Sequence, residues 1–245
     1  IPLRLVGSEM CIRDRPISDE KIIKFIENHK QTLIDSSITF FEATTALAFE
    51  HFAEESVDIA IVETGLGGRL DSTNVLSPIQ TIITEIHYDH THILGDSIEE
   101  ITSEKCGIFK DQTPSMTVNS DPRAIKTIKE HALIKNVAVS FIKKENIVVK
   151  NQTPISVNFK YENQQFTIPQ AGSYQAQNAI MAIKTCQNNF NHLTHENIQL
   201  ALDGSIPMDV EERILCTVGL TQKKGGSVYC PVCRRPALSL VHISE

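Results

Sequence analysis

Two polar residues stand at the ends of apolar runs that are typical of buried strands, and both could ligate a metal ion. Glu63 closes the run 57–63, and His90 lies just past the run 78–86. In an open parallel sheet, ligands bind beyond the carboxyl ends of the strands. One carboxylate and one imidazole suit a hard octahedral cation that retains several waters. The spacing therefore predicts a divalent-cation site at this edge of the sheet.

A second kind of metal chemistry is open at the same place. His87, His90 and His92 stand with Asp89 within six positions, and histidine and aspartate are zinc ligands. A zinc-dependent hydrolase that uses this cluster is therefore an alternative. The spacing does not follow the helical HExxH pattern, so we expect His87 and His92 to be ordinary polar loop residues.

A glycine-rich turn, GLGGRLD (65–71), follows Glu63. Gly65, Gly67 and Gly68 allow the backbone to turn tightly and to approach a ligand closely. The turn is neither GxGxxG nor a Walker A loop, because no Gly-Lys-Ser/Thr follows it or occurs elsewhere in the chain.

The positions of three further residues predict whether their side chains are buried or exposed. Spacing alone makes Lys105, on a predicted helix 97–106, a solvated surface residue, and Cys106 a small buried one. Asn178 lies inside a predicted helix 172–189, where asparagine is unfavourable. It must therefore be either exposed or bonded to something specific.

The elements that position these residues follow from hydrophobic periodicity. Helix 39–54 is expected to bury a wide face. Alternation of helices and apolar strands, followed by a β ribbon, predicts an α/β fold: a mostly parallel sheet flanked by helices, with a small antiparallel appendage. The predicted helices are 17–34, 39–54, 97–106, 121–134, 172–189 and 194–202; the predicted strands are 57–63, 78–86, 115–118 and 137–142, and the ribbon is 146–168.

Composition limits the function classes. The 245 residues carry a net charge of −7, which disfavours nucleic acid and membrane surfaces as partners. No window of 18 apolar residues occurs, so no transmembrane helix is expected. Six scattered cysteines fit a reducing, cytoplasmic location.

Four segments together resemble the folylpolyglutamate synthase/dihydrofolate synthase family of Mur-ligase-like, ATP-dependent amide ligases. They are TFFEATTALAFEHFA (39–53), VDIAIVETGLGGRLDSTNV (57–75), DHTHILGDSIEEITSEKCGIFK (89–110) and GSYQAQNAIMAI (172–183). The resemblance covers about residues 16–203. It implies a partial central ATPase domain of the P-loop NTPase-like type, and an activity in which ATP converts a carboxylate to an acyl phosphate that the amine of L-glutamate attacks.

The resemblance also implies residue roles. Glu63 and His90 are similar to the family's Mg²⁺ ligands, and Lys105 to its carbamylated lysine, which overrides the expectation from spacing. Asn178 is similar to the residue at the adenine end of ATP. The residues similar to the family's pterin or folate contacts are Thr39, Phe40, Phe41, Glu42, Leu70, Asp71 and Ser72.

The chain departs from the family in two respects. It lacks the Gly-Lys-Ser phosphate loop and a Trp-Pro-Gly-Arg-like stretch, so we expect this chain alone to be inactive. We expect the parent to be a monomeric ligase. Residues 16–205 are the expected domain, 1–15 adapter-derived sequence, and 206–245 a foreign or frame-shifted tail. Dihydropteroate and tetrahydrofolate (or its polyglutamates) both remain open as substrates. Another Mur-type ligase, acting on a cell-wall precursor, is a further alternative.

Overall fold

Parallel strands form the centre of the fold. The computed structural model describes residues 11–12, 15–190, 193–203 and 240–243. Its main sheet has the order β3-β10-β4-β5-β6, and every neighbouring pair is parallel. These strands are β3 (Ile61–Glu63), β4 (Gln80–Ile83), β5 (Ser115–Thr117), β6 (Val139–Phe141) and β10 (Leu240–Ile243). The predicted α/β class with a parallel sheet is confirmed.

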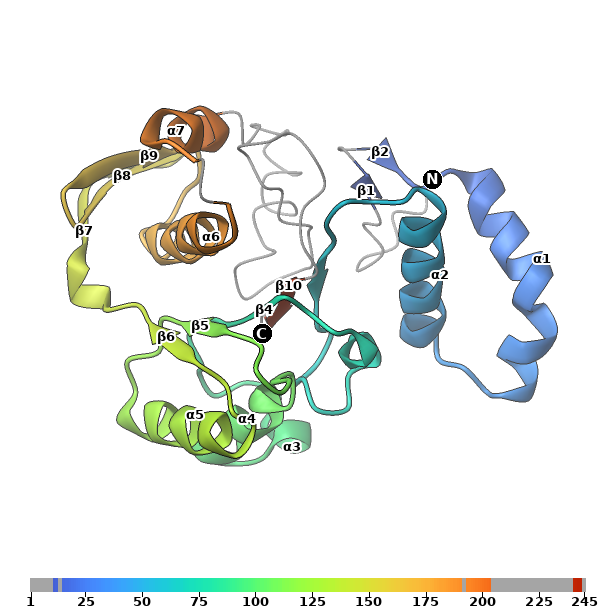
Figure 1. The fold of residues 1–245 in the computed structure, drawn as a ribbon. Coiled ribbons are helices and arrows are strands. Elements are labelled where there is room, and N and C mark those ends of the chain that lie inside the picture. The colour runs from blue at the N-terminus through green and yellow to red at the C-terminus, as the bar shows by residue number, and fades with distance from the viewer. Residues whose placement is uncertain (1–10, 13–14, 191–192, 204–239, 244–245) are drawn as a thin grey trace.

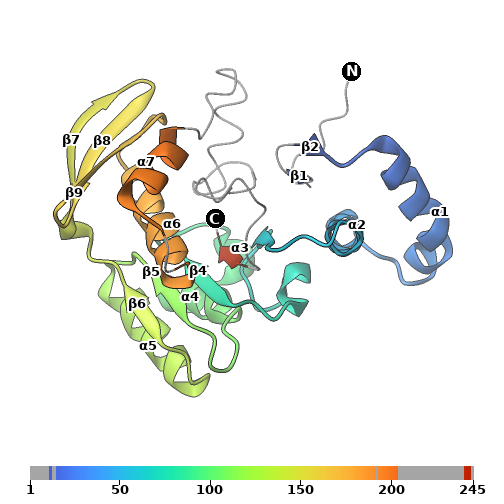
Figure 2. The ribbon, with the colours of Figure 1, turned by 45° about the horizontal axis from the view of Figure 1, so that its top comes forward.

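Helices cover both faces of this sheet (Figures 1 and 2). Because successive strand residues point to opposite faces, Ile82 packs toward Ile180 of α6, whereas Ile83 packs with Ile101 of α4 and Ile128 of α5. The helices of the domain are α3 (Thr91–Leu94), α4 (Ile98–Cys106), α5 (Pro122–Ile134), α6 (Gln175–Asn189) and α7 (His195–Asp203), with short 3₁₀ turns η1 (Ser72–Val75) and η2 (Lys144–Asn146).

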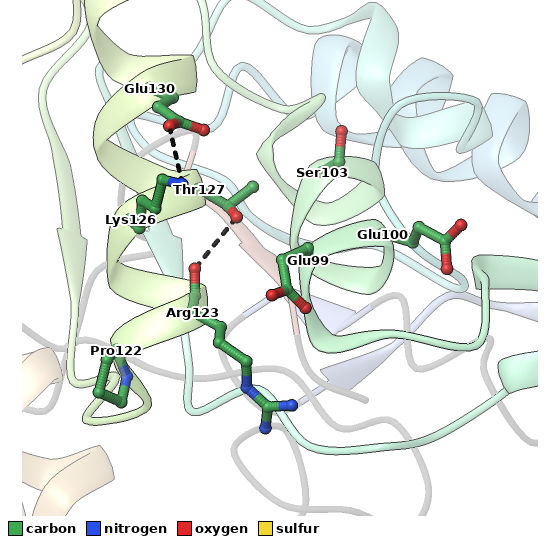
Figure 3. A pocket seen from close by; sticks show the side chains of 8 residues that line it. All are labelled: Glu99, Glu100, Ser103, Pro122, Arg123, Lys126, Thr127 and Glu130. Carbon is green, nitrogen blue, oxygen red and sulfur yellow. Dashed lines mark hydrogen bonds and ion pairs between the residues drawn. The ribbon is translucent and has the colours of Figure 1, made fainter.

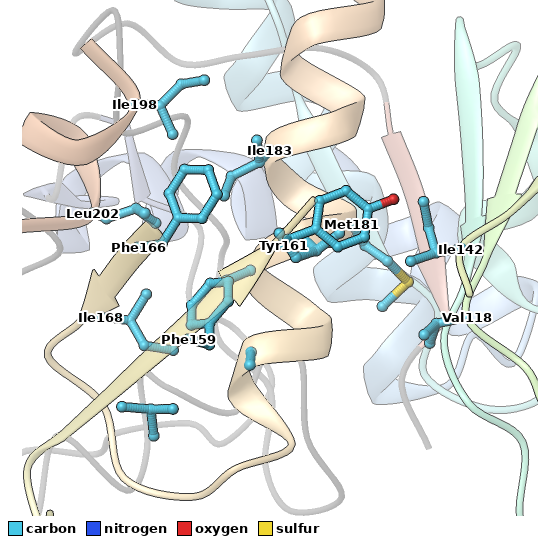
Figure 4. Packing of buried hydrophobic residues seen from close by; sticks show 14 of the residues in the cluster. Val118, Ile142, Phe159, Tyr161, Phe166, Ile168, Met181, Ile183, Ile198 and Leu202 are labelled. Atoms are coloured by element: carbon cyan, nitrogen blue, oxygen red, sulfur yellow. The ribbon is translucent and has the colours of Figure 1, made fainter. Parts of the chain in front are cut away.

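The predicted ribbon is an antiparallel sheet, ordered β7-β8-β9, that packs on α6 and α7. Its strands are β7 (Ile147–Thr153), β8 (Ser156–Tyr161) and β9 (Gln164–Ile168). Phe159 and Phe166 stack with ring centroids 5.5 Å apart and are fully buried under α6 and α7 (Figure 4). This sheet is the predicted antiparallel appendage.

Two further helices lie apart from the sheet (Figures 1 and 2). α1 (Asp19–Asp35) and α2 (Phe40–Glu54) pack on each other around Phe25 and Leu47. The expectation that α2 buries a wide face is wrong: Phe40 is 59% exposed and Phe41 37%. A single partner helix covers a narrow stripe only, so the rest of the apolar face stays open.

The expected tail contributes to the sheet. β10 pairs Val241 with Val62 of β3 and His242 with Ile82 of β4. A strand between two parallel neighbours needs only a short apolar run, and LVHI supplies one. Within the predicted adapter-derived segment 1–15 and the residue after it, β1 (Cys11–Ile12) pairs antiparallel with β2 (Arg15–Pro16). The remaining residues of 1–15 and 206–245 lie outside the described part of the chain.

Helix ends follow the predicted signals. Ser97 and Glu100 form a capping box on α4, as the sequence predicts. Thr39 and Glu42 form a second capping box on α2. Within the described residues, no helix has the length and hydropathy that a membrane span requires.

Candidate functional site

The glycine-rich turn after β3 is held in shape by Asp71. One carboxylate oxygen accepts hydrogen bonds from the backbone N–H groups of Gly65 (2.8 Å) and Leu66 (3.0 Å). The other accepts from the N–H (2.9 Å) and hydroxyl (2.6 Å) of Thr73 at the start of η1. Four bonds to the loop itself make Asp71 a structural clamp at this site.

The glycines of the turn allow a close approach to another part of the chain. A Cβ on Gly68 would lie 2.9 Å from the carbonyl oxygen of Lys105. Gly107 faces the backbone of Arg69 at similarly close range. Arg69 also donates from its backbone N–H to the carbonyl of Glu104 at 2.9 Å, and its guanidinium binds both carboxylate oxygens of Glu104. The turn is therefore fixed to the C-terminal end of α4.

The start of α2 lies against the same turn. A Cβ on Gly65 would lie 2.5 Å from the Phe41 ring, and the hydroxyls of Thr45 and Ser72 are 3.0 Å apart. The start of α2 and the turn, which the family resemblance associates with one ligand, are thus close together. Their exposed apolar side chains include Phe40 and, at 80% exposure, Leu70.

Thr39 and Glu42 have a structural use in this arrangement. The Glu42 carboxylate accepts from the Thr39 hydroxyl (2.6 Å) and backbone N–H (2.8 Å). These two hydrogen bonds hold the pKa of Glu42 below its ordinary value. The pair caps α2 and so fixes where Phe40 and Phe41 emerge.

Glu63 is the last residue of β3, as predicted. The next residue, Thr64, is 3% exposed, and its hydroxyl has no hydrogen-bond partner in the described part of the chain. A buried polar atom without a partner is costly. A carboxylate beside an unsatisfied hydroxyl at a strand end fits a site that a polar ligand completes.

His90 is held in an unusual backbone conformation. Its φ of 47° lies in the left-handed region, where it serves as the N-cap of α3. Its N–H donates to the Asp89 carboxylate at 2.7 Å, and its Nε2 lies 3.6 Å from the same group. Non-glycine residues in this region are uncommon and cluster at functional sites. The imidazole is exposed and accessible.

The described residues contain no group of three or more His, Cys, Asp or Glu side chains that could hold a metal. His87 instead faces Glu85, with Nε2 3.7 Å from Oε2. The arrangement does not support the zinc alternative, which needs such a cluster. A site with few protein ligands suits Mg²⁺, which keeps several waters and binds through one or two carboxylates.

Lys105 is buried, with 3% of its surface exposed. The expectation from spacing, a solvated lysine, is wrong, because the glycine-rich turn covers the end of α4. Its neighbour Cys106 is buried as expected, and burial raises the pKa of that thiol. Lysine is almost never fully buried unless its charge is paired, so Lys105 is held by specific interactions at the end of α4.

Asn178 is buried in α6, and its amide donates to the side-chain oxygen of Gln175 at 3.1 Å. Of the two expectations for this residue, the specifically bonded one is correct. Asn178 and Gln175 thus form a buried polar pair on α6, the helix that covers one face of the sheet.

A hollow of about 580 Å³ lies between α4 and α5 (Figure 3). Its lining includes Glu99, Glu100, Arg123 and Glu130. None of the predicted site residues lines it. This hollow is therefore separate from the candidate site around the glycine-rich turn.

The protein-family model of the Mur ligase middle domain matches residues 16–186, which is more than half of the chain. The chain belongs to the Mur ligase family. Within it, the chain is 35% identical over 214 residues to the dihydrofolate synthase/folylpolyglutamate synthase of Bacillus subtilis, covering 80% of this chain and 50% of that protein. The resemblance seen in the sequence is confirmed.

Solved structures agree with this similarity. A folylpolyglutamate synthase from Thermotoga maritima is 32% identical with a TM-score of 0.68, over 80% of this chain and 47% of that one. A structure described as an FPGS–AMPPCP–folate complex is 30% identical with a TM-score of 0.66, over 76% and 49%. The chain spans about half the length of the relatives that it matches.

Proposed function

We propose that this chain is the central part of an ATP-dependent amide ligase that adds L-glutamate to a folate-type acceptor. The relatives named above are folylpolyglutamate synthases, and one structure holds an ATP analogue and folate. The observation that carries the proposal is the glycine-rich turn. It joins three elements: the end of β3 with Glu63, the start of α2 with Phe40 and Phe41, and the end of α4 with Lys105.

The acceptor is proposed to bind where α2 meets the turn. Phe40 and Leu70 offer exposed apolar surface that a pterin ring can cover. Phe41 and Ser72 line the same junction, whereas Thr39, Glu42 and Asp71 hold its shape through their own hydrogen bonds. Both dihydropteroate and tetrahydrofolate carry such a ring, so both are proposed acceptors.

Glu63 and His90 are proposed to hold Mg²⁺, with Thr64 at the same strand end. When bound, Mg²⁺ neutralises charge on the phosphates during transfer. Lys105 is proposed to react with CO₂ to form a carbamate. Its ammonium first loses one proton, the neutral amine attacks the carbon of CO₂, and a second proton leaves, so that a buried cation becomes an anion. Asn178 is proposed to contact the adenine end of ATP.

The proposed reaction has two steps. The acceptor carboxylate attacks the γ-phosphorus of ATP, forming an acyl phosphate and releasing ADP. The amine of glutamate then attacks the acyl carbon, phosphate leaves, and the amine loses a proton. Because the chain contains no Gly-Lys-Ser/Thr phosphate loop, we propose that it does not complete the first step alone. The parent is proposed to be a cytoplasmic monomer.

The test uses the longest reading frame that contains this chain, together with the chain itself. Phosphate release is measured with ATP, glutamate and either tetrahydrofolate or dihydropteroate, and a cell-wall precursor serves as the competing acceptor. We expect turnover by the longer protein with a folate-type acceptor only. Turnover with the cell-wall precursor alone would move the function to another Mur-type ligase, and turnover by the chain alone would refute its inactivity.

Single variants of the longer protein test the residue roles. Lys105→Ala, Glu63→Gln and His90→Ala should each lower kcat at least about a hundredfold, as loss of a charge-stabilising group does. Lys126→Ala, an exposed lysine on α5, is the matched control. For the carbamate, intact-protein mass measured with and without bicarbonate should differ by one CO₂ in the wild type and not in Lys105→Ala.

A further inference from the structure

The segment that leads from β4 to His90 is held along its length by the segment that follows β5. The regular ladder between these strands ends at the pair Ile83 and Thr117. Beyond it, side chains take over the pairing. Asn119 accepts a hydrogen bond from the N–H of Ile86 (2.8 Å) and donates to the carbonyl of Thr84 (2.7 Å). The amide thus replaces two backbone groups of a parallel ladder.

The same segment makes two more contacts farther along. Ser120 donates to the Glu85 carboxylate at 3.2 Å. Arg123 donates to the Tyr88 hydroxyl at 3.1 Å, and its guanidinium lies 5.9 Å from the centre of that ring. Each of these contacts, and that of Asn119 with Thr84, joins residues 35 positions apart. Residues from Thr84 to Tyr88 are therefore contacted in chain order by residues from Asn119 to Arg123.

The clamp is itself anchored. Asn119 is 5% exposed, and its amide also donates to the Thr117 hydroxyl at 2.7 Å, so its orientation is fixed. Asp121 caps α5 and binds the Arg123 guanidinium at 2.7 Å. Hydrogen bonds from Arg123 lower the pKa of Asp121 to about 2. The anchor therefore stays ionised at neutral pH.

We infer that Asn119, Ser120 and Arg123 are positioning residues that set the place of His90. They fix residues 84–88, and the chain then reaches His90 in two residues, in a left-handed conformation that needs support. The inference rests on the proposed function for the role of His90 as a metal ligand. The clamp itself rests on the contacts alone.

The sequence offered a weak signal for this clamp. Asn119 follows a predicted buried strand directly, in the place that corresponds to the residues after β4. A polar residue at such a strand end can pair with the neighbouring connection. Only the structure identifies which backbone groups it meets.

Hydrogen–deuterium exchange tests the clamp without reference to activity. In Asn119→Ala the Ile86 amide should exchange about tenfold faster, since it loses its acceptor. In Asn119→Asp the acceptor for Ile86 remains but the donor to the Thr84 carbonyl is lost, so protection of Ile86 should lie between that of the wild type and that of Asn119→Ala. Arg123→Ala, at an exposed position, should speed exchange around Tyr88. This variant tests the clamp even if the Asn119 variants do not fold. Lys126→Ala on the same helix should change neither.

A second readout addresses His90 itself. Titration with Mn²⁺ should broaden the NMR signals of the His90 ring but not those of His131 on α5. In Asn119→Ala and Arg123→Ala the same broadening should need about tenfold more Mn²⁺. Equal Mn²⁺ response in all variants, or faster exchange that extends equally to α6, would overturn the positioning role. If the His90 signals of the wild type do not change with Mn²⁺, the proposed metal role of His90 is wrong. The hydrogen-exchange rates then decide by themselves whether Asn119 and Arg123 hold residues 84–88.

Discussion

The backbone of Gly107 lies against the backbone of Arg69 with no space for a side-chain carbon between them. A Cβ on Gly107 would lie 2.6 Å from the Arg69 nitrogen. The φ of Gly107 is −57°, which any residue can adopt. Glycine is therefore needed here for space and not for conformation.

Gly107→Ala should lower the free energy of unfolding by about 2–3 kcal/mol, because the turn must move away from α4. Thermal and urea unfolding of the chain measure this. Glu99→Ala on the exposed side of α4 is the control, with a change within about 0.5 kcal/mol. An alanine variant as stable as the wild type would show that the turn and α4 are not in contact.

Asp71→Asn should destabilise the chain by about 2 kcal/mol. The amide nitrogen of asparagine cannot accept from the N–H groups that the carboxylate now binds. Asp58→Asn, at an exposed carboxylate before β3, is the matched control. If Asp71 contacted substrate without holding the turn, stability would stay unchanged and only substrate binding would suffer.

His90→Gly and His90→Ala should differ in stability. Both remove the imidazole, but alanine must keep the left-handed backbone of His90, which costs about 1 kcal/mol more than glycine. Urea unfolding should rank the glycine variant above the alanine variant. Equal stabilities would mean that the backbone leaves this conformation in solution.

Acid should loosen the pair of helices α1 and α2. Burial, and then the nearby Lys21 ammonium, lower the pKa of His51, whose Nδ1 lies 3.2 Å from that amine. Glu55, with Glu54, keeps the Lys21 pKa raised, so the amine stays charged. Since the unfolded state binds the proton more readily, this contribution is complete above the ordinary histidine pKa of 6.5 and is lost as pH falls below it.

Urea unfolding at pH 7.5 and 5.5 measures the effect. His51→Gln should remove much of this pH dependence. A wild-type stability that rises on acidification would contradict the assignment.

Local signals in the sequence were sufficient for most elements. Ser97 with Glu100 marked the start of α4, and apolar runs located β4 and β5 with the strand end at Glu63. Burial that depends on distant segments could not be predicted. Lys105 is covered by a turn that lies some 35 residues earlier in the chain, and Arg69 reaches Glu104 at the same separation.

The exposure of Phe40 and Phe41 could not be predicted from the sequence. Periodicity indicates which face of a helix is apolar, but it does not show which other element covers that face. The resemblance to a known family supplied the grouping of α2 with the turn. Its physical basis, the contact of Phe41 with Gly65 and of Thr45 with Ser72, required coordinates. The clamp by Asn119 likewise depends on the register of two strands.

The separate packing of α1 and α2 has a consequence for cooperativity. These helices bury their own small cluster around Phe25 and Leu47, apart from the two clusters that hold the sheet. Elements with few buried contacts open locally at a lower free energy than the whole domain. We therefore expect the helix pair to open at a lower free energy than the sheet, so that the exposed surface of Phe40 can rearrange while the strand end with Glu63 stays folded.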